Sequence, residues 1–282
     1  MILLSDNELH TLLNEDVPFG DPTTSSFGID KQHARMTFAT RDEPLILSCT
    51  EEVVRLSKMF GLEVVRTSAT GTYVEKKTIF LELHGEAGTI HRLWKTLQNL
   101  LDYASGIATY THQLVTSARQ CNPDIIIATT RKTVPFSKKI AIKSIEAGGA
   151  IAHRLGLSES ILVFDYHRVF FATDELFTQA FYKLKRSNLE QKIVVEVENL
   201  DDALRFASLG ADILQLEKFS LSTLKDDVAI LRSKFPNLLL MATGGINLAN
   251  VQPYTQCGVD VIVTSSPYSA KPADIKVKIE PL

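Results

Sequence analysis

The stretch IIIATTRKT, Ile125–Thr133, sets the plan for the second half of the chain. Its β-branched run ends in small hydroxylic residues and then in two cations, Arg131 and Lys132. A short run that is apolar throughout is typical of a strand buried on both faces, as in a parallel sheet. The stretch therefore predicts a buried parallel strand with polar side chains at its carboxyl end.

Five later stretches repeat this plan, each an apolar run that ends in polar or charged residues. They are ILVF before Asp165, KIVV before Glu196, ADIL before Gln215–Glu217, LLLMA before Thr243–Gly245 and VDVIV before Thr264–Ser266. Helical patterns at residues 201–208, 221–234 and 248–257 lie between them. This alternation predicts a parallel α/β sheet, and a closed or nearly closed barrel is the simplest way to complete it. The polar strand ends would then face a shared active site.

The composition of the chain argues against several classes of protein. Of 282 residues, 45% are hydrophobic and 22% are charged, and the net charge of −3 gives no overall attraction to nucleic acid or to an acidic membrane. No apolar run approaches the roughly 18 residues of a membrane-spanning helix. The start, MILLSDNELH, lacks the basic flank of a signal peptide. The three cysteines are scattered without metal-ligand spacing. We expect a soluble, cytoplasmic protein without nucleic-acid or membrane partners.

The first half of the chain follows a different pattern. Ser5–Glu15 predicts a helix, with Ser5 and Glu8 at the spacing of a capping box. Glu15–Ser26 is rich in Pro, Gly and Asp and predicts a loop. Short apolar runs between Arg35 and Glu86, with a helical pattern at Thr50–Phe60, predict an α+β sandwich.

The longest helical pattern, Thr89–Ala118, leads from the sandwich into the barrel, and Ser105–Gly106 within it favours a kink or a break. A further helix is expected at Lys138–Glu146, and the alternating tail, Asp274–Leu282, predicts a last strand that returns to the N-terminal sheet. We therefore divide the chain into an N-terminal sandwich domain (1–106), a barrel domain (107–268) and a C-terminal strand (269–282).

Three kinds of chemical group fall at the predicted mouth of the barrel. The cations are Arg131, Lys132 and Arg154, with His153 beside them, and they suit carboxylate or phosphate. The carboxylates are Glu196 and Glu217, which could hold ribose hydroxyls, stabilise an oxocarbenium ion or bind Mg²⁺ through water. The third kind is a candidate phosphate cradle, formed by Thr243–Gly244–Gly245 before a helix and by Ser265. Together the three groups match phosphoribosyl pyrophosphate.

Several stretches in order resemble the quinolinate phosphoribosyltransferase (nicotinate-nucleotide pyrophosphorylase) family, most closely its ModD branch, which is found with molybdate transport systems. They are EDVPFGDPTT, NLLDYASGIAT, TRKTVPFSKK, GGAIAHRLGLSE, VVEVENLDDA, GADILQLE, ATGGINLANV and GVDVIV, and they span nearly the whole chain. The resemblance implies a seven-stranded α/β barrel and a homodimer, with a higher oligomer left open. In that dimer the partner's N-terminal domain would cover each barrel mouth.

The resemblance also implies roles for individual residues. Arg131, His153 and Arg154 would hold the carboxylates of an aromatic acid, and Lys95 would reach in from the other subunit, at a position where the family has an arginine. The region that binds the donor and its Mg²⁺ would be lined by Lys132, Glu196 and Glu217. The Mg²⁺ ion would be held mainly by the pyrophosphate group of the donor. Thr243, Gly244, Gly245 and Ser265 would take the 5′-phosphate.

The chain departs from the family pattern at several of these positions. It reads FDYH where the family reads KDNH, so Phe164 replaces a lysine and Tyr166 an asparagine, and Ala152 replaces the asparagine of NHR. Glu217 stands for an aspartate and Ser265 for a glycine. A carboxylate that loses its cationic partner in a buried site costs several kcal/mol. We therefore expect a ring less charged than quinolinate, or differently shaped, held partly by stacking on Phe164.

The leading hypothesis is a Mg²⁺-dependent phosphoribosyltransferase that joins phosphoribosyl pyrophosphate to a nitrogenous aromatic acid and releases pyrophosphate. The alternatives are a true quinolinate phosphoribosyltransferase, which also decarboxylates, and a binding or regulatory protein that retains the fold without catalysis. Retention of both glutamates and of the cation pair argues against the last alternative, because a site without catalysis has no physical need for clustered like charges.

Overall fold

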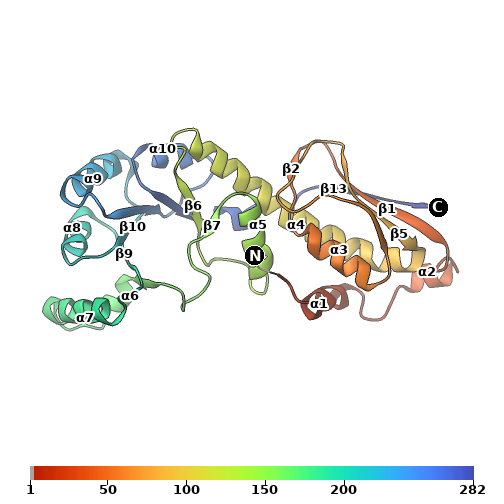
Figure 1. The fold of residues 1–282 in the computed structure, drawn as a ribbon, viewed down its shortest axis with the longest axis horizontal. Helices are drawn as coiled ribbons and strands as arrows, with labels where there is room; N and C mark the ends of the chain where they lie inside the picture. The colour runs from red at the N-terminus through yellow and green to blue at the C-terminus, as the bar shows by residue number, and fades with distance from the viewer. Residues whose placement is uncertain (1–2) are drawn as a thin grey trace. The chain divides into compact units, whose positions relative to one another are not determined.

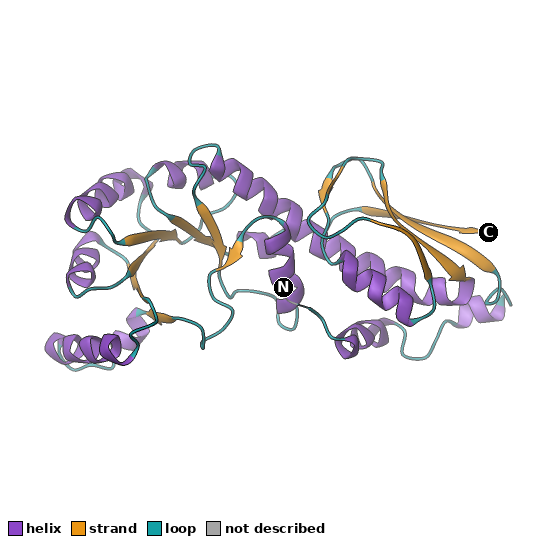
Figure 2. Ribbon diagram, in the orientation of Figure 1, coloured by secondary structure: helices purple, strands orange, loops and turns teal. Residues whose placement is uncertain are grey.

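The computed structural model describes residues 3–282, and contacts within the chain divide it into two compact units. The first unit takes residues up to His112, together with Thr133–Gly149 and Pro267–Leu282. The second takes Gln113–Lys132 and Ala150–Ser266. The mixed α/β class is as predicted, and Figures 1 and 2 show its elements. The domain limits 1–106, 107–268 and 269–282 stay a prediction, because contacts alone do not say which segments fold independently.

An antiparallel sheet forms the first unit, and helices cover one of its faces (Figure 2). Within the described residues its order is β13 (Ile275–Pro281), β1 (His33–Thr40), β5 (Ile79–Glu86) and β3 (Glu63–Thr67). Helices α3 (Thr50–Met59) and α4 (Ala87–Arg119) supply Val53, Leu56, Leu93 and Leu97 to the core beneath the sheet. Strands β2 (Leu45–Ile46) and β4 (Tyr73–Val74) form a separate small ladder. The return of the C-terminal strand to this sheet is confirmed.

Near the N-terminus the predicted first helix is confirmed, whereas the prediction of a loop at Glu15–Ser26 was wrong in part. Helix α1 (Asp6–Asp16) has the capping box of Ser5 and Glu8. The segment predicted as a loop contains a short helix, α2 (Pro22–Ser26). Asp21 caps that helix by accepting hydrogen bonds from the backbone N–H groups of Thr23 and Thr24, which satisfies donors that a helix start leaves open. Proline is favoured at the first position of a helix, and so Asp21 and Pro22 together begin α2.

Helix α4 runs unbroken from Ala87 to Arg119, so the break expected at Ser105–Gly106 was wrong. These small residues instead admit neighbouring chain segments. A Cβ added at Gly106 would lie 2.3 Å from the carbonyl oxygen of Lys271, and Oγ of Ser105 accepts the backbone N–H of Ser48. Gly106 therefore permits close packing of the segment that leads into β13.

The second unit is built on a curled parallel sheet. Among residues 3–282 its seven strands have the order β7 (Ile151–Ala152), β6 (Ile126–Thr129), β12 (Val261–Thr264), β11 (Leu239–Thr243), β10 (Ile213–Glu217), β9 (Ile193–Val197) and β8 (Ile161–Val163). Because β7 and β8 stand at the two edges and do not pair, the sheet is a curled half-barrel and not the closed or nearly closed barrel that the sequence predicted. Strand β7 was not predicted from the sequence, because its two residues are too few to form an apolar run.

Helices join the strands of this sheet. They are α6 (Asp165–Arg168), α7 (Asp174–Ser187), α8 (Leu200–Ser208), α9 (Leu221–Lys234) and α10 (Val251–Gln256), and the 3₁₀ turn η1 (Ser266–Ser269) follows β12. Helix α5 (Lys138–Ala147) lies between β6 and β7 in sequence but belongs to the first unit.

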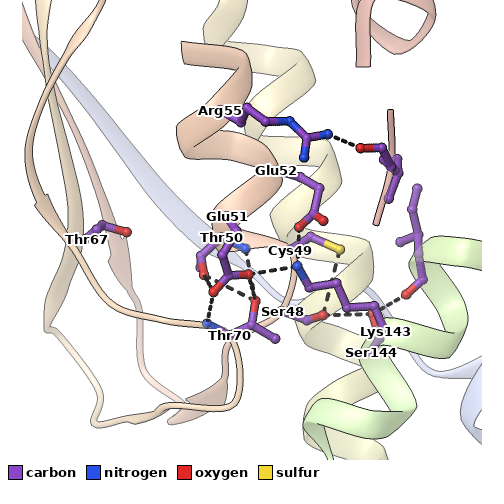
Figure 3. A network of polar contacts seen from close by, with 12 residues as sticks. Ser48, Cys49, Thr50, Glu51, Glu52, Arg55, Thr67, Thr70, Lys143 and Ser144 are labelled. Carbon is purple, nitrogen blue, oxygen red and sulfur yellow. Dashed lines mark hydrogen bonds and ion pairs between the residues drawn. The ribbon is translucent and has the colours of Figure 1, made fainter. Parts of the chain in front are cut away.

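A buried ion network attaches α5 to α3 within the first unit (Figure 3). Nζ of Lys143 lies 2.5 Å from Oε2 of Glu52 and 2.8 Å from Oε2 of Glu51. The side chain of Glu52 is 0% exposed, and that of Lys143 is 5% exposed. Hydroxyl groups extend the network, since Oγ of Ser48 lies 3.0 Å from Oγ of Ser144. The positive charge of Lys143 offsets the desolvation cost of burying the Glu52 carboxylate.

We predict that Lys143→Met lowers the free energy of unfolding by about 3 to 5 kcal/mol, because it leaves a buried carboxylate unpaired. Urea unfolding of the full chain measures this change. Lys139→Met is the matched control, since Nζ of Lys139 pairs with Glu8 at 2.8 Å while both side chains remain partly exposed. Similar losses in the two variants would contradict the role given to burial.

A half-buried acid, Asp102, ties α4 to the start of β13. Its Oδ1 accepts the backbone N–H of Ile275 at 3.0 Å, and its carbonyl oxygen accepts that of Ala273 at 2.8 Å. Burial, helped by the charge of nearby Asp274 and opposed by the hydrogen bond from Ile275, raises the pKa of Asp102 from 3.8 to about 6. A carboxyl whose pKa is raised in the folded state favours folding most when it is protonated. Stability is therefore lost as the pH rises from about 4 through about 6.

We predict that Asp102→Asn stabilises the protein at pH 7 by about 1 kcal/mol, less than full linkage would give because the carboxyl is only partly buried. The amide oxygen can still accept from Ile275. Urea unfolding of both proteins between pH 4 and pH 7 should show a difference that grows through this window. A variant that is less stable than the parent at every pH would disprove the assignment.

Candidate active site

Side-chain alternation brings the predicted site residues to the inner face of the second unit's sheet. The core cluster on that face consists of Ala128, Leu162, Val194, Ile213, Met241, Val261 and Val263. Along a strand every second side chain points to the same face. Continuing each strand from this cluster by steps of two leads to Phe164, Glu196, Gln215 and Glu217, Thr243 and Ser265. The predicted groups thus come from neighbouring strands and point to one side.

A hollow of about 220 Å³ lies at the carboxyl ends of β6, β10, β11 and β12. It gathers six of the predicted residues: Lys132, Glu217, Thr243, Gly244, Gly245 and Ser265. Oγ1 of Thr264 fixes one wall by donating to the carbonyl oxygen of Ile246 at 2.5 Å and accepting the backbone N–H of Ser266 at 3.0 Å. The hollow has the size and the hydroxyl and backbone donors that a phosphate group needs.

Gly244 and Gly245 form a turn that other residues could not make easily. Their φ angles are +98° and +72°, in the left-handed region that favours glycine. The helix expected directly after them begins only at Val251, so the donors come from a turn rather than from a helix end. Asn250 holds that turn by donating from its side chain to the carbonyl oxygen of Gly245 at 3.1 Å.

Glu196 and Glu217 lie close enough to repel each other. Burial raises the pKa of Glu196, and the charge of Glu217 raises it further. Nε2 of Gln215 opposes this rise by donating to Oε2 of Glu196 at 2.5 Å, and Nζ of Lys218 lies 3.2 Å from Oε1 of Glu217. Sequence reasoning missed Gln215 and Lys218. A polar residue inside an apolar strand is the signal that could have pointed to Gln215.

Arg154 is a buried cation without a paired carboxylate among the described residues. It is 8% exposed, its Nη2 donates to the carbonyl oxygen of Ser160 at 2.9 Å, and its Nε has no hydrogen-bond partner there. Burial lowers the pKa of Arg154, and the nearby charge of Arg131 lowers it further. Burial, together with Arg154, also lowers the pKa of His153. Arg131, His153 and Arg154 therefore form a second cluster, suited to an anion.

Phe164 provides an apolar surface at the carboxyl end of β8. It is half-buried and packs against the inner cluster of the sheet. Its ring stacks on that of His167 with centroids 5.8 Å apart, and Nδ1 of His167 accepts its backbone N–H at 2.9 Å. The ring is thus held in place by contacts on more than one side.

Comparison with known proteins gives the family. The model of the quinolinate phosphoribosyl transferase N-terminal domain matches residues 21–105, and that of the C-terminal domain matches residues 107–278. This chain belongs to the quinolinate phosphoribosyl transferase family. It is accordingly an enzyme that transfers a pentosyl group.

Individual relatives of this family extend over the whole chain. One, from Pasteurella multocida (strain Pm70), is named "Putative pyrophosphorylase ModD" and is 34% identical over 99% of both chains. Another, from Methanothermobacter thermautotrophicus, is named "Probable nicotinate-nucleotide pyrophosphorylase (carboxylating)" and is 30% identical over 97% of this chain and 98% of its own. The solved nicotinate-nucleotide pyrophosphorylase from Francisella tularensis has the same fold, with a TM-score of 0.88 at 23% identity over 99% of this chain and 98% of its own.

Lys95, the remaining predicted residue of this phosphoribosyl transferase site, belongs to the first unit. It is exposed, with Nζ 3.0 Å from Oε1 of Gln98 and 4.6 Å from the ring centroid of Trp94. Across residues 3–282, no group of three or more His, Cys, Asp or Glu could hold a metal ion. In the same part of the chain, every helix is too short or too polar to cross a membrane. The role of Lys95 stays a prediction.

The two glycines of the turn give a matched test of the phosphoribosyl transferase site. A Cβ at Gly244 would lie 2.5 Å from Cγ of Lys218 and 2.9 Å from its backbone N, whereas one at Gly245 would meet nothing within 4 Å. Both alanine variants have backbone strain, and only Gly244→Ala adds a clash. We predict a loss in the free energy of unfolding of about 2 to 4 kcal/mol for Gly244→Ala and about 1 kcal/mol for Gly245→Ala. Equal losses in chemical denaturation would argue against the close approach of Lys218.

Proposed function

We propose that this family member joins phosphoribosyl pyrophosphate to a nitrogenous aromatic acid in a Mg²⁺-dependent reaction that releases pyrophosphate. The observation that carries the proposal is the hollow at Gly244, which lies beside an acidic pair on neighbouring strands. A ribose phosphate donor needs this combination, because a phosphate pocket must adjoin groups that stabilise positive charge on the ribose ring. In the reverse direction the same reaction is a pyrophosphorolysis.

The donor would bind with its 5′-phosphate in the hollow. The N–H groups of Gly244 and Gly245 and the hydroxyl of Ser265 would donate to the phosphate oxygens. Lys132, which lines the same hollow, would supply a positive charge. Glu196 and Glu217 would accept hydrogen bonds from the ribose hydroxyls and stabilise the oxocarbenium-like transition state as the bond to pyrophosphate breaks.

The carboxylate pair also fits a divalent cation. Its oxygens are the ligands that Mg²⁺ prefers, and a cation would relieve the repulsion that raises the pKa of Glu196. Glu196 and Glu217 would hold the ion through water, with the pyrophosphate of the donor as its main ligand. When bound, Mg²⁺ neutralises the negative charge that develops on the leaving group.

The acceptor would bind its carboxylate at Arg154, Arg131 and His153. Arg154 suits this role because its buried guanidinium has an N–H group that no described residue satisfies. Phe164 offers a ring face rather than a charge, which favours an acid with fewer charges than quinolinate. Quinolinate itself is the second candidate, because the relative from Methanothermobacter thermautotrophicus carries the name of a carboxylating pyrophosphorylase.

The proposal includes a homodimer in which Lys95 of one subunit completes the acceptor site of the other, in a cytoplasmic protein. The proposal also includes a link to molybdate transport, which rests on the resemblance of the sequence to the ModD branch. A mixture of the Lys95→Ala and Arg131→Ala proteins, each inactive by itself, would regain activity if subunits share sites in this way.

A screen of acceptors tests the proposed reaction. Purified protein, phosphoribosyl pyrophosphate and Mg²⁺ are combined with pyridine and pyrimidine acids, and pyrophosphate release is measured with and without the cation. We predict release with at least one monocarboxylic acid and more than about tenfold lower turnover of quinolinate, since one lost charge-assisted contact has about that effect. Release of no pyrophosphate with any acid would disprove the transfer reaction.

The variant Phe164→Lys tests the choice of acceptor. It restores a cation beside the acceptor, so the affinity for quinolinate should rise about tenfold while that for the monocarboxylic acid falls. Formation of nicotinate mononucleotide from quinolinate by the unmodified protein, at a rate above that of every other acid, would instead establish the second candidate.

A further inference from the structure

We propose that Lys218 binds the phosphate group of the donor at the rim of the hollow formed by Gly244. This inference rests on the proposed function and adds a residue to it that the predicted set lacked. Lys218 directly follows β10 and Gly244 directly follows β11, so both lie at the same carboxyl edge of the sheet. Its role follows from its backbone, from the path of its side chain and from its ionic partner.

The backbone of Lys218 is held in a conformation that lysine rarely adopts. Its φ angle is +55°, in the left-handed region, although it carries a side chain. Its N–H donates to the carbonyl oxygen of Thr243 at 2.8 Å, which ties the end of β10 to the residue before Gly244. Unfavourable backbone conformations that the surrounding structure enforces are concentrated at functional sites.

The side chain of Lys218 lies directly over Gly244. A Cβ at Gly244 would be 2.5 Å from Cγ of Lys218, and so the glycine makes room for the lysine stem. That Cβ would also be 3.2 Å from Oε1 of Glu217, so the side chains of Glu217 and Lys218 both lie close to Gly244. The stem therefore passes over the turn whose N–H groups would bind phosphate.

The ammonium group has a partner that it can exchange. Nζ lies 3.2 Å from Oε1 of Glu217, while the lysine side chain is 76% exposed. Glu217 lines the hollow, so a phosphate bound there would compete for the same ammonium. Because the lysine side chain is largely exposed, solvent screens its pairing with the half-buried Glu217, and exchange of that partner costs little free energy. In the free protein Lys218 neutralises Glu217, and with donor bound it would contact the phosphate.

The plain alternative is a surface lysine that pairs with its neighbour and does nothing else. That pairing explains the distance to Glu217. It does not require a left-handed backbone, a glycine beneath the stem or a hydrogen bond to the strand end that precedes the phosphate turn. The combination of these features favours a binding role.

Calorimetric titration of the full-length protein with ribose 5-phosphate tests the proposal. Lys218→Asn removes the ammonium while keeping a residue that tolerates the left-handed backbone, and Lys218→Gly relieves the strain entirely. We expect both variants to bind ribose 5-phosphate about tenfold to a hundredfold more weakly, because a charge-assisted hydrogen bond to phosphate is lost. Lys218→Arg should stay within about threefold of the parent, since it keeps the charge.

Lys77→Asn is the matched control. Lys77 has a φ angle of +58° and belongs to the first unit, so the same substitution is made on the same backbone conformation at a residue outside the proposed site. Its affinity should equal that of the parent. Equal binding of ribose 5-phosphate by the parent, Lys218→Asn and Lys218→Gly would overturn the role of Lys218 and leave the proposed function intact.

Two further arms separate the other outcomes. A loss of affinity for inorganic pyrophosphate, with that for ribose 5-phosphate unchanged, would overturn the placement of the ammonium at the Gly244 hollow. If the parent protein bound neither ribose 5-phosphate nor phosphoribosyl pyrophosphate, the proposed function would fail together with this inference.

Discussion

The site of this protein depends on one geometric constraint, the alternation of side chains along parallel strands that end at a common edge. Several inner-facing apolar residues near the strand ends are followed two positions later by a polar one, as Val194 is by Glu196 and Met241 by Thr243. Parallel pairing keeps these residues in register, since Gln215 lies opposite both Glu196 and Met241. A shift of one residue in any strand would turn its functional group to the outer face.

The same constraint separates the charges of the site. Acidic groups come from β9 and β10, in the half of the curled sheet that ends at β8, whereas Arg154 follows β7 at the opposite edge. Glu196 and Arg154 therefore do not form an ion pair with each other, and the charge of each is left for a ligand to neutralise. The burial that raises the pKa of Glu196 also lowers that of Arg154, so both groups are stabilised by a ligand of opposite charge. Sites of this kind bind substrates that carry separated charges.

Much of this arrangement was predictable because its causes are local in sequence. Buried parallel strands are continuous apolar runs, and a helix start such as Ser5 with Glu8 is specified within four residues. Features that depend on distant segments were not predictable. Gly106 looked like a helix breaker because Lys271, which approaches it, is remote in sequence. Strand β7 is too short to produce a pattern, and the backbone of Lys218 is set by Thr243 on the next strand. The individual roles of the site residues stay predictions.

The pairing of β13 with β1 has a consequence for folding of the protein during its synthesis on the ribosome. Arg35 and Glu280, which face each other across these strands, are 245 residues apart in the chain. Until the last segment emerges, β1 presents an unpaired edge, and such edges readily recruit strands of other chains. The sheet of the first unit is thus incomplete until β13 has been synthesised, and we expect chaperones that shield nascent polypeptides to bind at β1 until then.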